Sequence, residues 1–297
     1  MKVIKPIAVT DAILVSSTAP ENDYPAWGAG TAYALGARVI LASTHRIYES
    51  LQAANTGHAP DSNATWWLDV GPTNRWACFD QQISTATVLA SPLNVTLAPG
   101  YVNSVALLAL VGGAATVTVT DGPGGATVYN QTVQLDGTLI ADWYQYVWEA
   151  FNPLTELVLT DLPPYINARV IVSITGGGSV ACGGLVVGTV YELGDTRPGA
   201  RIGVIDYSRK DTDAFGITTF VKRAYSKRMS VSLSLPTAQV SKVQQLIGAL
   251  RATPCVWIGS PGAQYQALIV FGFYRDFSIV VEFQTYSACN LEIEGLT

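Results

Sequence analysis

Charged side chains are scarce in this sequence. Only 13% of its 297 residues are Asp, Glu, Lys or Arg, whereas 49% are apolar, and the formal net charge is −5. The basic residues are dispersed apart from one cluster after residue 220, so the composition does not favour a nucleic-acid partner. We expect instead a protein of two or three domains that covers surface against copies of itself or against neighbouring proteins.

Histidine is also scarce, and this limits the catalytic chemistry. His45 and His58 are the whole supply, and neither stands in the sequence context of a serine or cysteine nucleophile. The phosphate-binding, HExxH and EF-hand patterns are missing as well. A glycosidase needs only two carboxylates, but the acidic residues of the middle section have a spacing that specifies nothing: Asp121, Asp136, Asp142, Glu149 and Asp161. We therefore expect no enzyme, no cofactor and no metal site.

Cysteines are few, and no long apolar run is present. The four cysteines lie far apart without a CxxC pair, which predicts buried thiols of a protein made inside the cell rather than zinc ligands: Cys78, Cys182, Cys255 and Cys289. Pro6 and Asp11 interrupt the apolar N-terminus, so we expect no export signal. The longest apolar stretch, residues 105–119, is too short for a membrane helix and predicts a buried strand pair, so no membrane insertion is expected.

Alternation of apolar and polar residues predicts a mainly β fold. In residues 115–135 the valines alternate with Thr and Gln on both sides of a Gly-Pro-Gly-Gly turn, a pattern typical of a hairpin. The same period recurs in three further segments, which we expect to be strands: residues 168–175, 229–235 and 277–283.

One segment has a helical period instead. Val240, Val243, Ile247 and Leu250 fall on one helical face, Thr237 is a suitable N-cap, and a proline follows at position 254. We expect a single true helix at about 237–252.

Turn residues and composition divide the chain into four parts. We expect an N-terminal arm (1–23), a small aromatic module (24–73), a β-sandwich of jelly-roll type (74–194), and a C-terminal β domain with the helix (195–297). The segment 191–203 contains glycines and a proline and is the best linker candidate.

The aromatic module resembles the small carbohydrate-binding modules found beside chitinases and cellulases, those of families five and twelve. The residues that carry this resemblance are Trp27, Tyr33, Gly36, Val39, Tyr48, Glu49, Asn55, Thr56, Pro60, Trp66 and Trp67. The resemblance covers about 45 residues and departs from the family pattern at Arg38 and at the turn 44–46. It implies a sugar-binding surface of aromatic rings, for which the candidates are Trp27, Trp66, Trp67 and Tyr48.

A module of this size depends on its large rings for a core, because so few apolar residues are available. We therefore expect Tyr33, Tyr48 and one of the adjacent tryptophans to be structural. Neighbouring residues of a strand point to opposite faces, so one of Trp66 and Trp67 is expected to be buried. The other, together with Trp27, is the candidate for stacking on a sugar ring.

The whole chain resembles tail or baseplate proteins of tailed bacteriophages that carry a carbohydrate-binding-like domain. The segments that carry this resemblance include YPAWGAGTAYALGARVI, DLPPYINARVIVSI and VFGFYRDFSI. The sandwich resembles galactose-binding jelly rolls, and the last section resembles tail-tube and distal-tail folds. These resemblances imply a structural protein of the virion tail, assembled in the bacterial cytoplasm as a homo-oligomeric ring that contacts other tail proteins.

Four cations in the last section are candidates for the assembly interface: Lys222, Arg223, Lys227 and Arg228. A plain solvated strand face is an equal alternative for them. Two other functions stay open, namely a receptor-binding protein that recognises a host cell-surface glycan, and an enzyme that degrades a polysaccharide. The second requires a cleft with paired carboxylates, which sequence cannot reveal.

Overall fold

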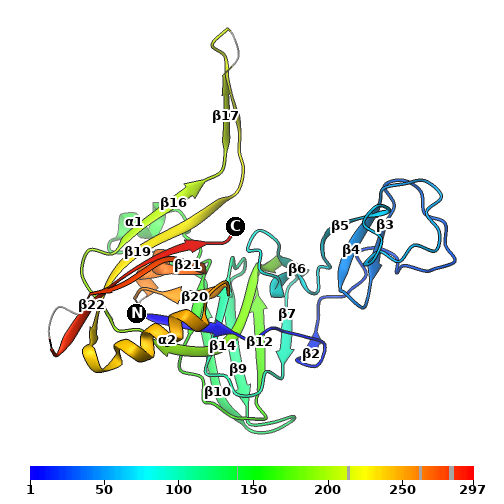
Figure 1. The fold of residues 1–297 in the computed structure, drawn as a ribbon. Coiled ribbons are helices and arrows are strands. Elements are labelled where there is room, and N and C mark those ends of the chain that lie inside the picture. The colour runs from blue at the N-terminus through cyan, green and yellow to red at the C-terminus, as the bar shows by residue number, and fades with distance from the viewer. Residues whose placement is uncertain (139, 213–214, 261–262, 281–283) are drawn as a thin grey trace.

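The fold is mainly β, as predicted, in a computed structural model that describes all residues except 139, 213–214, 261–262 and 281–283. Its largest element is a ten-stranded antiparallel sheet (Figure 1). In spatial order the strands are β11 (Leu157–Leu159), β8 (Ser104–Leu108), β14 (Gly184–Glu192), β1 (Lys2–Pro6), β20 (Cys255–Ile258), β21 (Ile269–Val280), β22 (Tyr286–Gly295), β19 (Tyr225–Pro236) and β15 (Asp195–Thr196), and β16 (Arg201–Asp206) also pairs with β19.

A five-stranded sheet covers one end of this large sheet and forms a β-sandwich with it. Its strands, in spatial order, are β10 (Thr127–Gln134), β9 (Ala114–Thr120), β12 (Arg169–Thr175), β7 (Leu93–Leu97) and β2 (Leu14–Ser17). Buried and half-buried residues alternate along β9 and β12, because one face of each strand packs on the core. The predicted hairpin at 115–135 is confirmed as β9 and β10.

The apolar stretch 105–119 gives two buried strands that belong to different sheets. β8 pairs with β11 and β14, whereas β9 pairs with β10 and β12. Leu107 and Val117 belong to the same apolar cluster. The prediction of a strand pair was therefore wrong, since the two strands pack face to face across a core instead of sharing a ladder.

The N-terminal segment 1–23, expected as an arm, contributes one strand to each sheet: β1 belongs to the large sheet and β2 to the five-stranded sheet. β1 lies between β14 of the sandwich and β20 of the C-terminal section, and it is hydrogen-bonded to both. Val3 and Ile4 have no exposed surface. Gly188 permits the close pairing, because a Cβ there would lie 2.1 Å from the Lys5 carbonyl oxygen. One continuous sheet thus joins the two sections.

The predicted helix is confirmed as a 3-10 turn (Thr237–Gln239) followed by α2 (Val240–Ala249). Val243, Ile247 and Leu250 are buried against the C-terminal end of the large sheet. Leu185 and Val187 of β14 belong to the sandwich core, whereas Tyr191 packs on the helix cluster. Residues four apart on a strand lie on the same face of its sheet. The helix α2 and the five-stranded sheet therefore lie side by side on one face of the large sheet (Figure 1).

The opposite face of the large sheet holds a third apolar cluster, which includes Ile4, Val256 and Phe271. Glu156 lies directly before β11 at one end of the sheet, and it accepts a hydrogen bond from Lys227 Nζ of β19 near the other end. Gln266 Nε2 donates to the Glu156 carbonyl oxygen at 3.0 Å. The contact with Lys227 joins the two ends of the sheet in its curled form, and the contact with Gln266 ties the start of β11 to the turn before β21.

Two parts project from this body (Figure 1). The aromatic module contains the sheet β3 (Arg38–Leu41), β4 (Arg46–Ser50) and β5 (Trp67–Pro72). A long hairpin continues β16 and β19 outward through β17 (Arg209–Thr212) and β18 (Thr218–Val221). We call residues 201–224 the hairpin arm.

The remaining elements are short. They are the ribbon of β6 (Thr87–Ala90) with β13 (Ser179–Cys182), the 3-10 turns Ala77–Phe79 and Ala263–Leu268, and the helix α1 (Trp143–Trp148). The four cysteines are buried free thiols, as predicted. Among the described residues, no helix has the length and apolar character that crossing a membrane requires.

Candidate functional site

The aromatic module is built around two of its predicted rings. Tyr48 and Trp67 are 6% and 2% exposed and form its core with Val39. Tyr33 packs edge-on against Trp67, with ring centroids 5.3 Å apart, and its hydroxyl accepts a hydrogen bond from Gly28 N–H at 2.7 Å. Tyr33, Tyr48 and Trp67 are therefore structural, in agreement with the expectation for a small aromatic core.

Buried polar groups fix the orientation of the tryptophan pair. Trp67 Nε1 donates to the His58 carbonyl oxygen at 2.8 Å. Asn55 is fully buried and its Nδ2 donates to Ser50 Oγ at 3.0 Å, while its Oδ1 lies 3.0 Å from His58 Nδ1. Most of the loop between β4 and β5 is not paired with a strand. These side-chain hydrogen bonds fix its conformation instead.

Trp66 and Trp27 are the half-buried tryptophans of the module. The His58 ring stacks on Trp66 with centroids 3.9 Å apart and an angle of 11° between the planes. One face of Trp66 is therefore covered. Trp27 Nε1 is buried and has no hydrogen-bond partner within the described part of the chain, so Trp27 can offer a ligand its ring but not its N–H. The two rings are the module's remaining stacking candidates.

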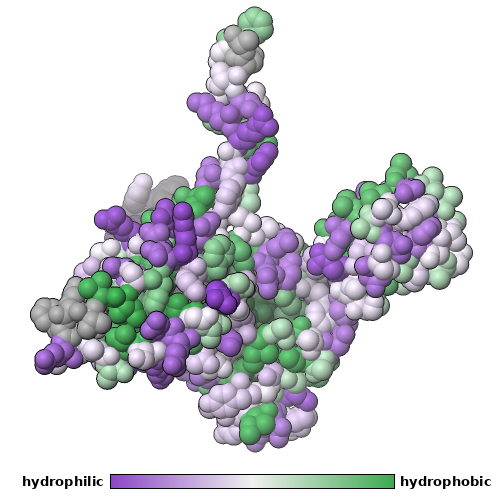
Figure 2. Space-filling model, in the orientation of Figure 1, coloured by the Kyte–Doolittle hydropathy of each residue, from purple (hydrophilic) through white to green (hydrophobic). Residues whose placement is uncertain are grey.

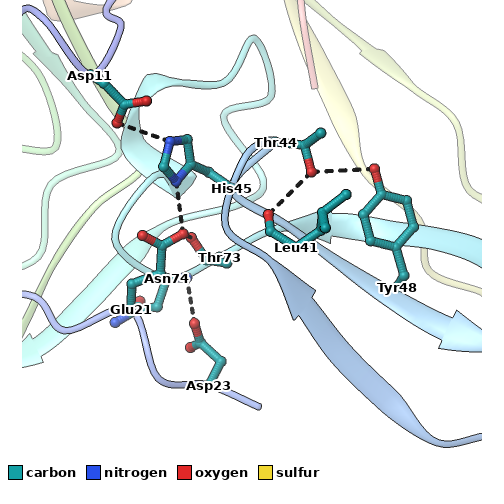
Figure 3. A network of polar contacts seen from close by, with 9 residues as sticks. All are labelled: Asp11, Glu21, Asp23, Leu41, Thr44, His45, Tyr48, Thr73 and Asn74. Atoms are coloured by element: carbon teal, nitrogen blue, oxygen red, sulfur yellow. Dashed lines mark hydrogen bonds and ion pairs between the residues drawn. The ribbon is translucent and has the colours of Figure 1, made fainter. Parts of the chain in front are cut away.

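A polar network at His45 joins the module to the body (Figure 3). His45 occupies the turn between β3 and β4 with φ +55°. Its Nδ1 lies 2.9 Å from Glu21 Oε1, which also accepts a hydrogen bond from Thr73 Oγ1 at 3.0 Å. Its Nε2 lies 3.0 Å from Asp11 Oδ1, which forms an ion pair with the ring when His45 is protonated. The ring stacks on Trp76 at 4.1 Å.

This network links three parts of the chain: the segment before the module, the module's own turn, and the segment after β5. Thr73 N–H donates to the His45 carbonyl oxygen at 2.9 Å, and Asn74 N–H donates to Asp23 Oδ2 at 3.1 Å. A cavity of about 330 Å³ lies beside it, lined also by Arg46 and Asp80. The contacts fix how the module is attached to the body.

The four predicted interface cations fall into two pairs. Lys227 and Arg228 lie on β19 and have partners within the chain, namely Glu156 and Glu292. Lys222 and Arg223 lie on the hairpin arm and are exposed. Of these four cations, Lys222 and Arg223 are the ones for which the described residues provide no ion pair.

The carboxyl group of Glu156, which pairs with Lys227, has a shifted pKa. Burial raises the pKa of Glu156 above its ordinary value, and this outweighs the lowering by Lys227. Glu156 Oε2 is also buried without a hydrogen-bond partner in the described residues. Closing the curled sheet is the role that its contacts support.

Comparison with known proteins gives no family. No family model matches the chain, and no curated protein matches its sequence. The resemblances to carbohydrate-binding modules and to phage tail proteins therefore stay predictions.

Sequence reasoning missed one conspicuous surface, the segment 136–152 around α1, which we call the aromatic loop. Asp142 caps α1 by accepting a hydrogen bond from Gln145 N–H at 2.8 Å, and α1 has no buried residue. The large apolar side chains that this loop exposes are Ile140, Trp143, Tyr144, Tyr146, Val147, Trp148 and Phe151. Apolar residues on all sides of a short helix were the signal that could have revealed it.

The His45 network predicts a pH-dependent attachment of the module. Burial lowers the pKa of His45, but the carboxylates of Glu21 and Asp11 raise it by more, so its pKa lies above the ordinary value of 6.5. Protonated His45 therefore stabilises the folded chain fully below pH 6.5, and this contribution is lost as the pH rises through the higher folded pKa. Because Asp11 is largely exposed, we expect an effect of no more than about 1 kcal/mol.

The measurement is thermal unfolding of the full chain and of His45→Asn between pH 5.5 and 8.5, since Asn tolerates the left-handed backbone at this position. The stability difference between the two proteins is expected to shrink as the pH rises. A difference that is constant or that grows with pH would contradict the assignment.

Proposed function

We propose that the protein is a structural subunit of a bacteriophage tail tip or baseplate, which assembles with copies of itself and presents the aromatic module. The observation that carries this proposal is that two segments expose large apolar side chains that the described residues leave uncovered. One is the aromatic loop. The other is the hairpin arm, on which Val204 and Phe220 are 65% and 72% exposed.

Apolar surface of this extent is typical of a protein that buries it against partners. The arm beyond β16 is a ribbon of only two strands, and such ribbons are marginally stable alone in water. The body behind them is a curled sheet with covered cores, suited to a mechanical support. The resemblance of the whole sequence to tail proteins supports the proposal that the protein is a component of the virion.

The proposal predicts self-association of the purified full-length chain. We expect a discrete oligomer by sedimentation velocity and closed rings by electron microscopy, because a repeated contact between different surfaces closes into a ring or continues as a filament. A chain that stays monomeric at every concentration up to its solubility limit would refute the proposal.

A second function, recognition of a host cell-surface glycan, is favoured by the half-buried rings of Trp27 and Trp66. Stacking of a sugar on one aromatic face gives weak binding, which many copies on one particle would multiply. On this proposal the ring assembly and the sugar-binding module act together in host attachment.

The tryptophan pair supplies a matched test of glycan binding. In titrations of the full chain with soluble chitin and cellulose oligosaccharides, Trp66→Ala is expected to abolish binding while the module stays folded. Trp67→Ala is expected to cost about 3–5 kcal/mol of stability, because it removes a core ring, and so controls for loss of fold. Binding that survives both Trp66→Ala and Trp27→Ala would exclude this face.

A further inference from the structure

We propose that the hairpin arm of one copy binds the aromatic loop of a second copy, and that this contact is the one that builds the assembly. The inference rests on the proposed function, because it names the two surfaces that would meet in the ring.

Charge is strongly segregated along this chain. The hairpin arm contains five Lys or Arg against three Asp, a formal charge of +2, while the chain as a whole carries −5 and the remaining residues therefore −7. No Lys or Arg occurs anywhere from residue 76 to residue 168, a stretch with seven acidic residues in which the aromatic loop lies. A basic projection and an acidic loop in one chain favour contact between copies, because opposite potentials steer and orient association.

The ionic groups on both segments are placed for such a contact. Lys222 and Arg223 are exposed on the arm. On the loop, Asp136 and Glu149 are exposed as well, and Glu149 takes part in the end of α1 through its backbone N–H, which leaves its carboxylate outside the helix hydrogen bonds. Figure 2 shows hydrophilic side chains gathered along the middle of the arm.

Apolar side chains accompany the charges on both segments. Trp143 and Trp148 of the loop are 83% and 72% exposed, and on the arm Ile202 and Val204 are 50% and 65% exposed on one face of β16. If the flat aromatic rings of the loop pack against the apolar face of β16, both surfaces lose contact with water at little cost in side-chain entropy.

The described residues give neither segment an apolar core of its own. A six-residue helix is far shorter than the roughly 12–15 residues at which an isolated helix becomes even marginal in water, and α1 buries no residue. The arm extends away from the body, and its outer end points away from α1 of the same chain (Figure 1). A second copy can supply the cover that each segment lacks within one chain.

The arm and the loop are different surfaces, so the contact is heterologous. Each copy would offer its arm to one neighbour and its loop to another. Repetition of one such contact gives a ring when the rotation closes, which is the geometry that the proposed function requires.

The test is a charge swap in the full-length chain, read by sedimentation velocity. The arm variant is Lys222→Glu with Arg223→Glu, and the loop variant is Asp136→Lys with Glu149→Lys; Asp142 is kept because it caps α1. Each double variant is expected to weaken self-association at least roughly tenfold, and their combination in one chain to restore it to within about threefold of the unaltered protein.

Matched controls separate this contact from general effects of charge and fold. Lys242→Glu with Arg251→Glu makes the same change of charge on exposed positions of α2 and the residues after it, and should leave association unchanged. Trp143→Ala with Trp148→Ala should weaken association as the charge variants do, whereas Tyr101→Ala, also an exposed aromatic, should not. Circular dichroism and the unfolding midpoint of each variant verify that it is folded.

The outcomes distinguish the two proposals. An oligomer that persists in the arm variant and in the Trp143 and Trp148 variant refutes the arm-to-loop contact and leaves the assembly proposal standing. Loss of association in both charge variants without recovery in the combined chain also refutes the pairing. A monomeric unaltered chain refutes both proposals.

Discussion

The pairing of β1 with two strands from distant parts of the chain is the interaction on which the rest of the structure depends. β1 is hydrogen-bonded to β14 on one side and to β20 on the other. Its side chains enter the cores on both faces of the large sheet, Val3 beneath the helix cluster and Ile4 in the cluster opposite. Without this strand the sandwich and the C-terminal section would each present an unpaired sheet edge.

The joined sheet makes the body a single support from which the appendages project. The ion pair of Glu156 with Lys227 closes the curl of the sheet just below the hairpin arm, since Lys227 stands in the strand that continues into it. The module is attached differently, through the His45 network and two connecting segments. On the proposed function, assembly and presentation are carried by separate parts of the molecule, each attached to the same body.

Local patterns in the sequence predicted the local structure well. The helix with Val243 and Ile247 inward and the hairpin at 115–135 follow directly from their periods of 3.6 and 2. Strand alternation predicted that one of Trp66 and Trp67 is buried, and Trp67 is, but Trp66 lies in the turn before β5 and not in the strand. The buried ring is held by the bond from Trp67 Nε1 to the His58 carbonyl oxygen. Long-range partners could not be predicted: nothing in residues 2–6 indicates that they lie between β14 and β20, and a charge count does not pair Glu156 with Lys227.

Native-state hydrogen exchange of the full chain tests the central claim, that β1 makes one cooperative sheet carrying separately attached parts. The amides of β14, β1 and β20 should exchange with one shared free energy of opening, the highest in the molecule, while amides of the module around Tyr48 should open independently at a lower free energy. Exchange from β14 at a clearly lower free energy than from β20–β22 would contradict the claim, because the two sections would then unfold separately.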